Sequence, residues 1–389
     1  MSKEKRRVPK LRFPGFTEDW EQRKADYIFK SVTDKGYPEL PVLSASQELG
    51  MVYRDQNGID IQHDKKNEAS YKRVLPGQFV IHLRSFQGGF AYSEIEGITS
   101  PAYTVINFKN SNEQYGLFWK HVFKSETFIK RLETITYGIR DGRSISFSDF
   151  KSLILWYPSF SEQKLIGDSL AVVEKGITLH QRKLEHLNLK KKALLQKLFP
   201  KNGERYPELR FPGFTDAWEQ RKLGDIVDFL DGQRKPLKES ERIKGKYPYY
   251  GASGIIDYIN DYLFDETLVL LSEDGANIID RNYPVCFIAT GKYWVNNHAH
   301  VLKVKSGIID KFICESLERL DYTKFNTGTA QPKLNQDICQ KIIISIPNEA
   351  EQKCISEFLD RINNIITLHQ RKLEHLQLQK KALLQQMFV

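Results

Sequence analysis

The sequence predicts an α+β protein in which two globular domains are joined by two long helices, pairing as an antiparallel coiled coil with pseudo-twofold organisation. Residues 9–24 (PKLRFPGFTEDWEQRK) return almost unchanged as residues 207–222, and residues 177–199 (ITLHQRKLEHLNLKKKALLQKLF) return as residues 366–388. The segments between these repeats differ in length and composition. Two long copies indicate a tandem of two modules with matched ends, because a solenoid would need more and shorter repeats.

The repeats divide the chain into four predicted parts. These are a first globular domain, the first long helix, a second globular domain and the second long helix, covering residues 1–158, 159–200, 201–347 and 348–389. Short β-rich runs bounded by Gly, Asn and Asp predict strands inside both domains. Such runs are residues 268–271, 285–289 and 301–304, with similar runs around Phe79 and Tyr103. Each long helix is expected to begin just after a proline, Pro158 or Pro347, where early acidic residues favour a helix start.

Apolar residues in the helical repeat follow a heptad spacing, which is typical of a coiled-coil seam. The predicted seam residues are Ile177, His180, Leu184, Leu187 and Lys191 in the first copy, and Ile366, His369, Leu373, Leu376 and Lys380 in the second. At ~1.5 Å per residue each helix would be a rod of roughly 60 Å, so a pair would set a fixed separation between the domains. The polar seam residues are interpreted as fixing the alignment of the helices, with a catalytic role for the histidines as the alternative.

The composition is that of a basic protein without membrane segments. The chain of 389 residues carries 58 Lys and Arg against 49 Asp and Glu, a formal charge of +9, which favours a polyanionic partner. No stretch approaches the ~18 apolar residues of a membrane span, and the start of the chain lacks the apolar segment of a signal peptide. A cytoplasmic location is therefore expected.

The sequence offers little for a metal site. The cysteines form no CxxC pair, which argues against zinc or a disulfide framework; they are Cys286, Cys314, Cys339 and Cys354. His298 and His300 would share a face if they lay on one strand and could then chelate a metal. Contact with nucleic acid, or packing, is favoured for both, so no metal is expected.

Catalytic motifs are absent for the main enzyme classes considered. The chain has no GxxxxGK[ST] loop, GxSxG elbow, HExxH motif or Asn/Asp-Pro-Pro-aromatic motif, and no catalytic residue is assigned. Asp149 precedes Glu162-Gln163-Lys164 and Asp337 precedes Glu351-Gln352-Lys353, which loosely matches metal-dependent nucleases. That chemistry needs the Glu-x-Lys segment on a strand, whereas here it opens a long helix, which favours a structural role.

Several long motifs recur in the same order in both modules, and others lie in the second insert. They are the PELRFPGFT-x-x-WEQRK opening, the Pro-x(3 or 4)-EQ-x-x-I start of a long helix, the KKALLQ-x-[LM]F end, and, in the second insert, YPYYGASGIIDYI, EDGANI and TGKYWVNNHAHVL. Together they span nearly the whole chain, which resembles a DNA sequence specificity subunit of a bacterial type I restriction-modification system. The first insert is the least diagnostic part and retains SYKRVLPGQFV and GITSPAYTV.

The resemblance implies that each globular domain is a target recognition domain that reads one half of a split, asymmetric DNA site. The paired helices would act as a spacer and as a dock for methyltransferase subunits. The chain would be a non-catalytic subunit of a complex that methylates adenine N6 and, with a restriction subunit, cleaves DNA. Its expected partners are double-stranded DNA, two methyltransferase subunits and restriction subunits where present. No cofactor is expected on this chain, because S-adenosylmethionine, ATP and Mg would be bound by the partners.

Glycine-rich loops with basic and amide side chains are the expected DNA-contacting segments. Basic groups neutralise phosphates or reach guanine edges, amides pair with adenine, and glycines allow close approach. The candidates in the first domain are Arg84, Ser85, Gln87, Tyr137, Arg140, Arg143 and Ser144. The candidates in the second are Lys292, Trp294, Asn296, Asn297, His298, His300, Thr327, Thr329, Gln331, Lys333 and Asn335.

Three other classes of protein share part of this pattern. A stand-alone pseudo-dimeric DNA-binding regulator would have the basic charge and the twofold organisation, but it would bind its site without methyltransferase partners. A coiled-coil adaptor would account for the helices and not for two unlike, glycine-rich domains. An autonomous nuclease would depend on Glu162 or Glu351 for metal-dependent cutting.

Overall fold

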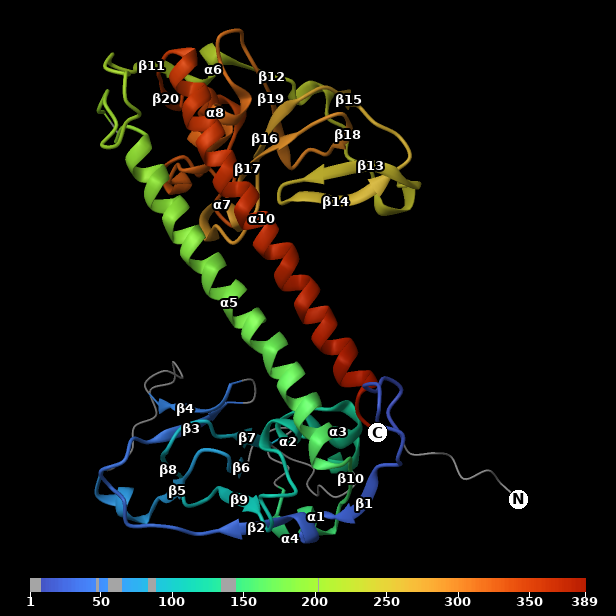
Figure 1. The fold of residues 1–389 in the computed structure, drawn as a ribbon. Coiled ribbons are helices and arrows are strands. Elements are labelled where there is room, and N and C mark those ends of the chain that lie inside the picture. Colours follow the sequence, from blue (N-terminus) through green and yellow to red (C-terminus); the bar gives the residue numbers. More distant parts are fainter. Residues whose placement is uncertain (1–7, 47–48, 55–64, 83–88, 134–144, 202) are drawn as a thin grey trace. The chain divides into compact units, whose positions relative to one another are not determined.

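The computed structural model describes residues 8–46, 49–54, 65–82, 89–133, 145–201 and 203–389 (Figure 1). The chain forms two compact units: unit 1 consists of Met1–Gln181 and Arg371–Val389, and unit 2 of Arg182–Gln370. Each unit therefore combines a globular domain with one half of each long helix. The division of the sequence at residues 158, 200 and 347 stays a prediction.

The globular part of unit 1 is built on a four-stranded antiparallel sheet in the order β2-β9-β6-β7. These strands are β2 (Phe29–Val32), β6 (Phe79–Ile81), β7 (Phe90–Tyr92) and β9 (Thr104–Phe108). Two further pairs are β3 (Leu43–Ser46) with β4 (Gly50–Tyr53) and β5 (Lys72–Val74) with β8 (Gly97–Thr99). The helices are α1 (Ala25–Ile28), the 3-10 helix η2 (Lys65–Ser70), α2 (Gly116–Val122), α3 (Glu126–Glu133) and α4 (Phe147–Ser152).

Unit 2 repeats that sheet order in β12-β19-β16-β17, although the two inserts are unlike in sequence. These strands are β12 (Val227–Phe229), β16 (Leu268–Ser272), β17 (Cys286–Ala289) and β19 (Ala299–Val304), which confirms the three predicted runs. A second sheet, β14-β13-β18-β15, has no four-stranded counterpart among the described residues of unit 1 and contains β13 (Lys244–Gly251), β14 (Gly254–Ile259), β15 (Phe264–Asp265) and β18 (Lys292–Val295). The helices are α6 (Leu223–Ile226), η3 (Asp231–Gln233), η4 (Glu239–Glu241), α7 (Asn277–Asp280), α8 (Asp310–Glu318), η5 (Tyr322–Lys324) and α9 (Gln336–Gln340).

The end of each front repeat, EQRK, forms a strand that closes its domain. β1 (Glu21–Lys24) pairs antiparallel with β10 (Ile154–Tyr157), and β11 (Glu219–Lys222) pairs in the same register with β20 (Ile343–Ile346). β10 and β20 each come directly before a long helix. The repeated sequence therefore holds together the two chain ends of each insert.

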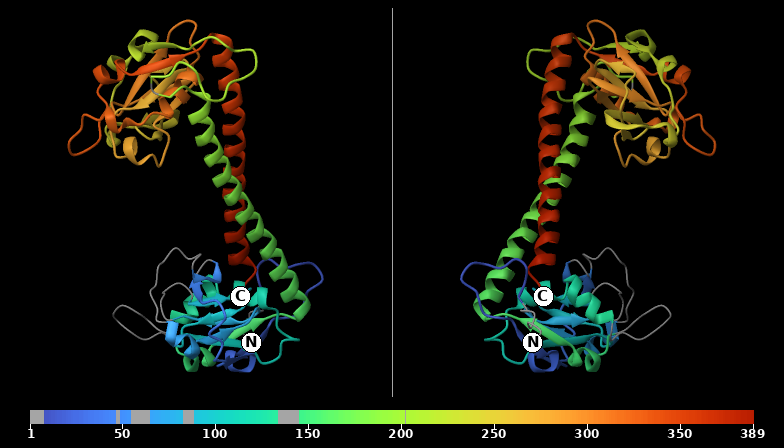
Figure 2. Two further views of the ribbon diagram at one scale, coloured as in Figure 1. Left: turned by 90° about the vertical axis from the view of Figure 1, so that its left-hand side faces the viewer. Right: turned by 90° about the vertical axis from the view of Figure 1, so that its right-hand side faces the viewer.

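The two long helices begin where the prolines predict. α5 (Phe160–Leu198) has 39 residues and α10 (Glu349–Gln386) has 38, and Figure 2 shows an unbroken ribbon for each. All ten predicted seam residues are buried or partly buried, whereas leucines between them, such as Leu179 and Leu189, are 67% and 62% exposed. The heptad positions are thus confirmed as the least exposed face of each helix.

An aromatic cluster recurs in both units and is built from the repeats. In unit 1 the Phe118 ring lies 5.7 Å from both Trp20 and Phe388. In unit 2 the Phe312 ring lies 5.7 Å from Trp218 and 5.4 Å from Phe199. In each unit the tryptophan belongs to the front repeat, and Phe388 or Phe199 follows the end of a long helix. Each ring pair adds about 0.5–1.5 kcal/mol to the docking of these segments on the domain.

The cysteines are free thiols, as the spacing predicts, with Cys286 and Cys339 buried and Cys314 and Cys354 partly buried. None of the described helices is long and apolar enough to cross a bilayer.

Candidate functional site

Each unit fixes its front repeat to the first turn of a long helix through a bidentate ion pair. In unit 1 Arg12 Nε and Nη2 donate to the two carboxylate oxygens of Glu162 at 2.7 and 2.8 Å. In unit 2 Arg210 makes the same pair with Glu351, at 2.8 Å for both bonds. Both carboxylates are 1% exposed and lie on helices. This geometry supports the structural role expected for them and gives no support to a nuclease centre.

The glutamine that follows each of these glutamates holds the domain to the helix. Gln163 Oε1 accepts from the backbone N–H of Tyr115, just before α2, at 3.0 Å, and Gln352 Oε1 accepts from Ile309, just before α8, at 3.0 Å. The Nε2 groups donate to two carbonyls each, including that of the proline before the helix, Pro158 or Pro347. These hydrogen bonds fix the position of the domain on the helix, because a buried polar group that lost its partner would stay desolvated and unpaired.

The two loops predicted to contact DNA in the second domain converge on the segment 273–275, within the EDGANI motif. The Glu273 N–H donates to the carbonyl of His298 at 2.9 Å, and the Leu334 N–H donates to the carbonyl of Glu273 at 2.7 Å. Gly275 N–H adds a bond to the carbonyl of Pro332 at 3.0 Å. The turn after β18 and the loop before α9 are therefore neighbours in space.

The loop before α9 is closed by its own hydrogen bonds. Asn326 Oδ1 accepts from the N–H groups of Gly328 and Lys333, both at 2.9 Å, and Thr327 N–H donates to the carbonyl of Lys333. A Cβ atom on Gly328 would lie 1.7 Å from the carbonyl oxygen of Gln331, so only glycine fits there.

The candidates of the second domain divide by exposure. Eight are exposed: Lys292, Asn297, His298, Thr327, Thr329, Gln331, Lys333 and Asn335. Three are buried: Trp294, Asn296 and His300. Trp294 Nε1 donates to the carbonyl of Lys235 at 2.6 Å, and Asn296 Oδ1 accepts from the N–H of His298. The exposed residues are the ones placed to touch a ligand, whereas the buried ones shape the surface that carries them.

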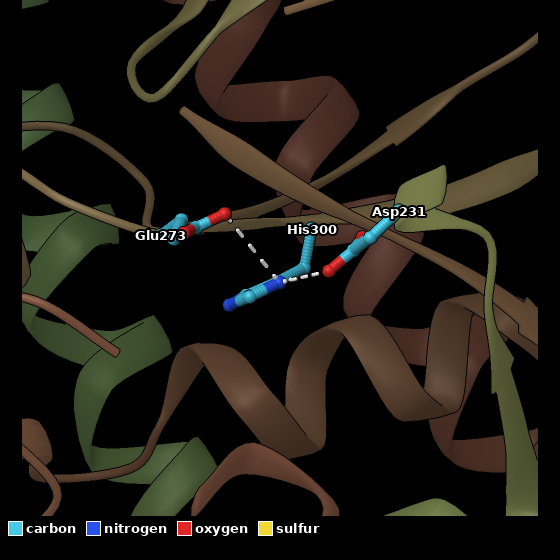
Figure 3. Close-up of side chains that lie close together, drawn as sticks. All are labelled: Asp231, Glu273 and His300. Atoms are coloured by element: carbon cyan, nitrogen blue, oxygen red, sulfur yellow. Dashed lines mark hydrogen bonds and ion pairs between the residues drawn. The ribbon is translucent and has the colours of Figure 1, made fainter. Parts of the chain in front are cut away.

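His300 is the centre of a buried ionic cluster behind these loops (Figure 3). Its ring is 1% exposed, with Nδ1 2.6 Å from Asp231 and 3.8 Å from Glu273. Arg234 bonds to Glu273 at 2.6 Å and lies 3.3 Å from Asp231, and Lys333 lies 3.4 Å from Glu273. The carboxylates are thus compensated by cations of the protein itself.

The same cluster is the group of possible metal ligands found among the described residues, but its hydrogen bonds oppose metal binding. His300 Nε2 lies 2.7 Å from the carbonyl oxygen of Leu334 and Nδ1 lies against a carboxylate, so both ring nitrogens must donate. Burial disfavours the charged ring, but the hydrogen bonds to Asp231 and Cys339 outweigh it and raise the pKa of His300 to about 10. A doubly protonated ring has no lone pair for a metal.

His298 and His300 do not share a strand face, because β19 begins at Ala299 and His298 lies in the preceding turn. His298 is exposed, and its Nδ1 lies 2.8 Å from Asp274. Asp231 and Arg234 belong to none of the sequence motifs, and Glu273 appears in them only as part of EDGANI. Residues so far apart in the sequence show no regular spacing, so their contacts could not be predicted from a motif.

The candidates of the first domain, Arg84, Ser85, Gln87, Tyr137, Arg140, Arg143 and Ser144, lie outside the described residues. His180 and His369, the seam histidines, are partly buried at equivalent positions of the two long helices.

Known proteins are similar to this chain in sequence and in fold. The sequence is 33% identical over 162 residues to a type I restriction enzyme specificity subunit of Haemophilus influenzae, covering 42% of this chain and 41% of that one. It is 24% identical over 274 residues to the type I restriction enzyme MjaVIII specificity subunit of Methanocaldococcus jannaschii, covering 60% and 61%. The chain thus spans less than two thirds of the length of these two relatives. A solved S subunit of a type I restriction-modification system from M. genitalium has the same fold, with a TM-score of 0.69 at 15% identity over 98% of this chain and 99% of that one.

The sequence also matches the family described as type I restriction modification DNA specificity domain, over residues 18–189 and again over residues 215–378. Each match contains one insert with its EQRK strand, its Glu-Gln pair and a large part of its long helix. Because the two matches together cover most of the chain, this protein belongs to the type I restriction-modification DNA specificity family.

Proposed function

We propose that this chain is the DNA-binding specificity subunit of a type I restriction-modification complex and that each unit reads one half of a bipartite, asymmetric DNA sequence. The observation that carries the proposal is the frame built twice: the Arg–Glu pair, the glutamine, the EQRK strand and the aromatic cluster recur in both units. A repeated frame presents two recognition surfaces, and unlike inserts make the two half-sites different.

The second unit offers a recognition surface of suitable chemistry. Lys292 and Lys333 are exposed cations that can neutralise phosphates, and Asn297 and Gln331 are exposed amides that can pair with adenine. The loop closed by Asn326 is a rigid support, so little ordering would be needed on binding.

The two long helices are proposed to pair as an antiparallel coiled coil that spaces the half-sites. In unit 1 Lys380 Nζ on α10 lies 2.7 Å from Glu174 on α5. A Cβ on Gly176 would lie 3.3 Å from Leu376 Cδ1. Moving toward the C-terminus along α5 therefore corresponds to moving toward the N-terminus along α10, which supports antiparallel pairing.

The helices also offer apolar docking points for two methyltransferase subunits. Leu179 and Leu368 occupy equivalent positions and are both 67% exposed, as do Leu189 and Leu378 at 62% and 68%. Exposed leucines at equivalent positions of the two helices support a protein partner. In this proposal the partners extrude the adenine and bind S-adenosylmethionine, ATP and Mg, whereas this chain positions the DNA and carries out no chemistry.

Genome-wide mapping of N6-methyladenine tests the proposal, in cells that carry the cognate methyltransferase with and without this chain. A split motif that is methylated only when the chain is present is expected, and it would give both half-sites and their gap. No difference, while another specificity subunit shows that the methyltransferase is active, would exclude the proposal and favour a stand-alone DNA-binding regulator.

Exchange of one insert tests the assignment of half-sites. Replacing residues 25–157 with the insert of another family member should change one half of the methylated motif and leave the other half and the gap unchanged. A change in both halves would contradict the modular assignment.

A further inference from the structure

The two units can be compared residue by residue where the globular domain meets the long helices. Gln163 and Gln352 receive the N–H groups just before α2 and α8, and Phe118 and Phe312 occupy the same place in the aromatic clusters. His121 on α2 and Glu315 on α8 follow these phenylalanines at the same spacing and are therefore equivalent.

In unit 1 the acid at this junction belongs to the long helix. Glu174 on α5 lies 2.7 Å from Lys380 and 3.1 Å from Lys120, with Lys124 at 4.0 Å. Burial opposes its ionisation, but the electrostatic interaction with His121 and the ammonium groups of Lys120 and Lys380 lower the pKa of Glu174 to about 2. His121 is fully buried beside it, and burial lowers the pKa of His121 to about 3, so the ring is neutral. We call Glu174, His121 and Lys380 junction 1.

In unit 2 the acid belongs to the globular domain instead. Glu315 on α8 lies 3.2 Å from Lys191, the helix lysine equivalent to Lys380. Asn363 on α10 stands at the position equivalent to Glu174 and donates from Nδ2 to Glu315 Oε1 at 2.9 Å. We call Glu315, Asn363 and Lys191 junction 2. In each junction a lysine of a long helix thus pairs with one acid. That acid lies on the long helix in junction 1 and on the globular domain in junction 2.

We infer that the two junctions decide which globular domain can be carried by which pair of helix segments. Moving the second domain onto the first helix segments would place Glu315 beside Glu174, two mostly buried carboxylates facing Lys380. Moving the first domain onto the second segments would place Lys124 near Lys191 without Glu174, since Lys120 keeps Glu94 of its own domain at 3.2 Å. Mostly buried like charges are strongly destabilising.

These contacts act on the assembly of the chain, whatever DNA each domain reads. The equivalence of the repeats by itself would make the two positions interchangeable. The contact chemistry makes the two positions different where each unlike insert meets the long helices.

An exchanged full-length chain tests the inference, with residues 25–157 replaced by a second copy of residues 223–346. Glu174→Asn should raise the thermal midpoint of the exchanged chain by about 2–8 °C and lower that of the native chain by a similar amount. Hydrogen exchange of α5 shows whether the change lies in unit 1. Glu185→Asn, at an exposed site on the same helix, is the matched control and should be neutral in both chains. The same sign of the Glu174→Asn effect in both chains would overturn the inference.

A second measurement in the native chain applies even where the exchanged chain does not fold. Glu315→His and Asn363→Glu should each lower the midpoint of unit 2, whereas the double variant, which rebuilds junction 1 there, should recover at least half of the summed loss. Asn364→Glu adds the same charge at an exposed neighbouring site and is the control. Additive losses in the double variant would refute the coupling.

Discussion

The bidentate pair between Arg210 and Glu351 should be one of the strongest single contacts of unit 2, and Arg210→Ala tests this. The substitution removes the two charge-assisted hydrogen bonds of the Glu351 carboxylate, which is 1% exposed in the native chain. It also removes the bond from Arg210 Nη2 to the carbonyl of Asp216. The front repeat would lose its attachment to the first turn of α10.

The magnitude follows from that desolvated carboxylate. Removing one partner of a buried ion pair costs about 3–5 kcal/mol, and the lower end applies here because the Arg210 side chain is 14% exposed and water can partly replace it. For a unit of the size of residues 182–370, each kcal/mol shifts the midpoint by about 2–4 °C. A loss of about 6–12 °C is therefore expected for unit 2.

Differential scanning calorimetry of the full chain measures this shift, and hydrogen exchange assigns it to unit 2. Lys197→Ala is the matched control, because Lys197 and Glu208 form a pair of the same 2.8 Å length with both side chains about half exposed. Such an exposed pair adds little stability. Arg12→Ala should repeat the Arg210→Ala result in unit 1, where the Glu162 pair has the same geometry.

An Arg210→Ala midpoint no lower than that of Lys197→Ala would refute the reasoning. A double variant, Arg210→Met with Glu351→Leu, separates the charge from the shape. It should recover most of the loss, since apolar groups of similar volume replace buried ion pairs at little cost.

Three further predictions concern the loop before α9 and the ionic cluster around His300. The pKa of His300 is about 10 in the folded state against an ordinary value of 6.5, so between these pH values the folded state binds one proton more than the unfolded state. The contribution of His300 to the free energy of unfolding of unit 2 should therefore be complete below pH 6.5 and be lost as the pH rises toward 10. His300→Gln should flatten this pH dependence, measured by thermal unfolding. Gly328→Ala should disturb the loop before α9 and weaken methylation at one half-site, with little change in the midpoint, as sequencing of methylated motifs would show. Adding zinc or a chelator should leave the midpoint of the wild type unchanged, because both nitrogens of His300 donate; stabilisation by zinc that His300→Gln removes would contradict this.

Much of the frame could be predicted because its signals are local. The prolines place the starts of α5 and α10, the heptad spacing gives their least exposed face, and three β-rich runs become β16, β17 and β19. These features depend on neighbours within a few residues along the chain, where periodicity and turn residues carry the information.

The partners inside the frame could not be predicted, because they are distant in sequence. The Glu-Gln pair at the start of each helix was visible, but the arginine that saturates the glutamate and the backbone N–H that meets the glutamine were not. His300 was singled out as a residue that contacts DNA, yet it is buried, and its two ring partners, Asp231 and the carbonyl of Leu334, approach it from different elements. Side-chain chemistry alone could not separate a buried imidazolium from a surface residue that contacts DNA.

The shared sheet order of two unlike inserts follows from where the frame holds each domain. In unit 2 the frame fixes β20 through β11, the start of α8 through Gln352, and Phe312 through the aromatic cluster. Between these points the chain must enter and leave at set positions, so few sheet orders are compatible with short connections. The segments 273–275 and 326–335 lie outside the frame contacts described above, since the hydrogen bonds given for them join them to the insert itself. Substitutions there can alter the exposed surface without loosening the frame, which is the property that a replaceable recognition surface requires.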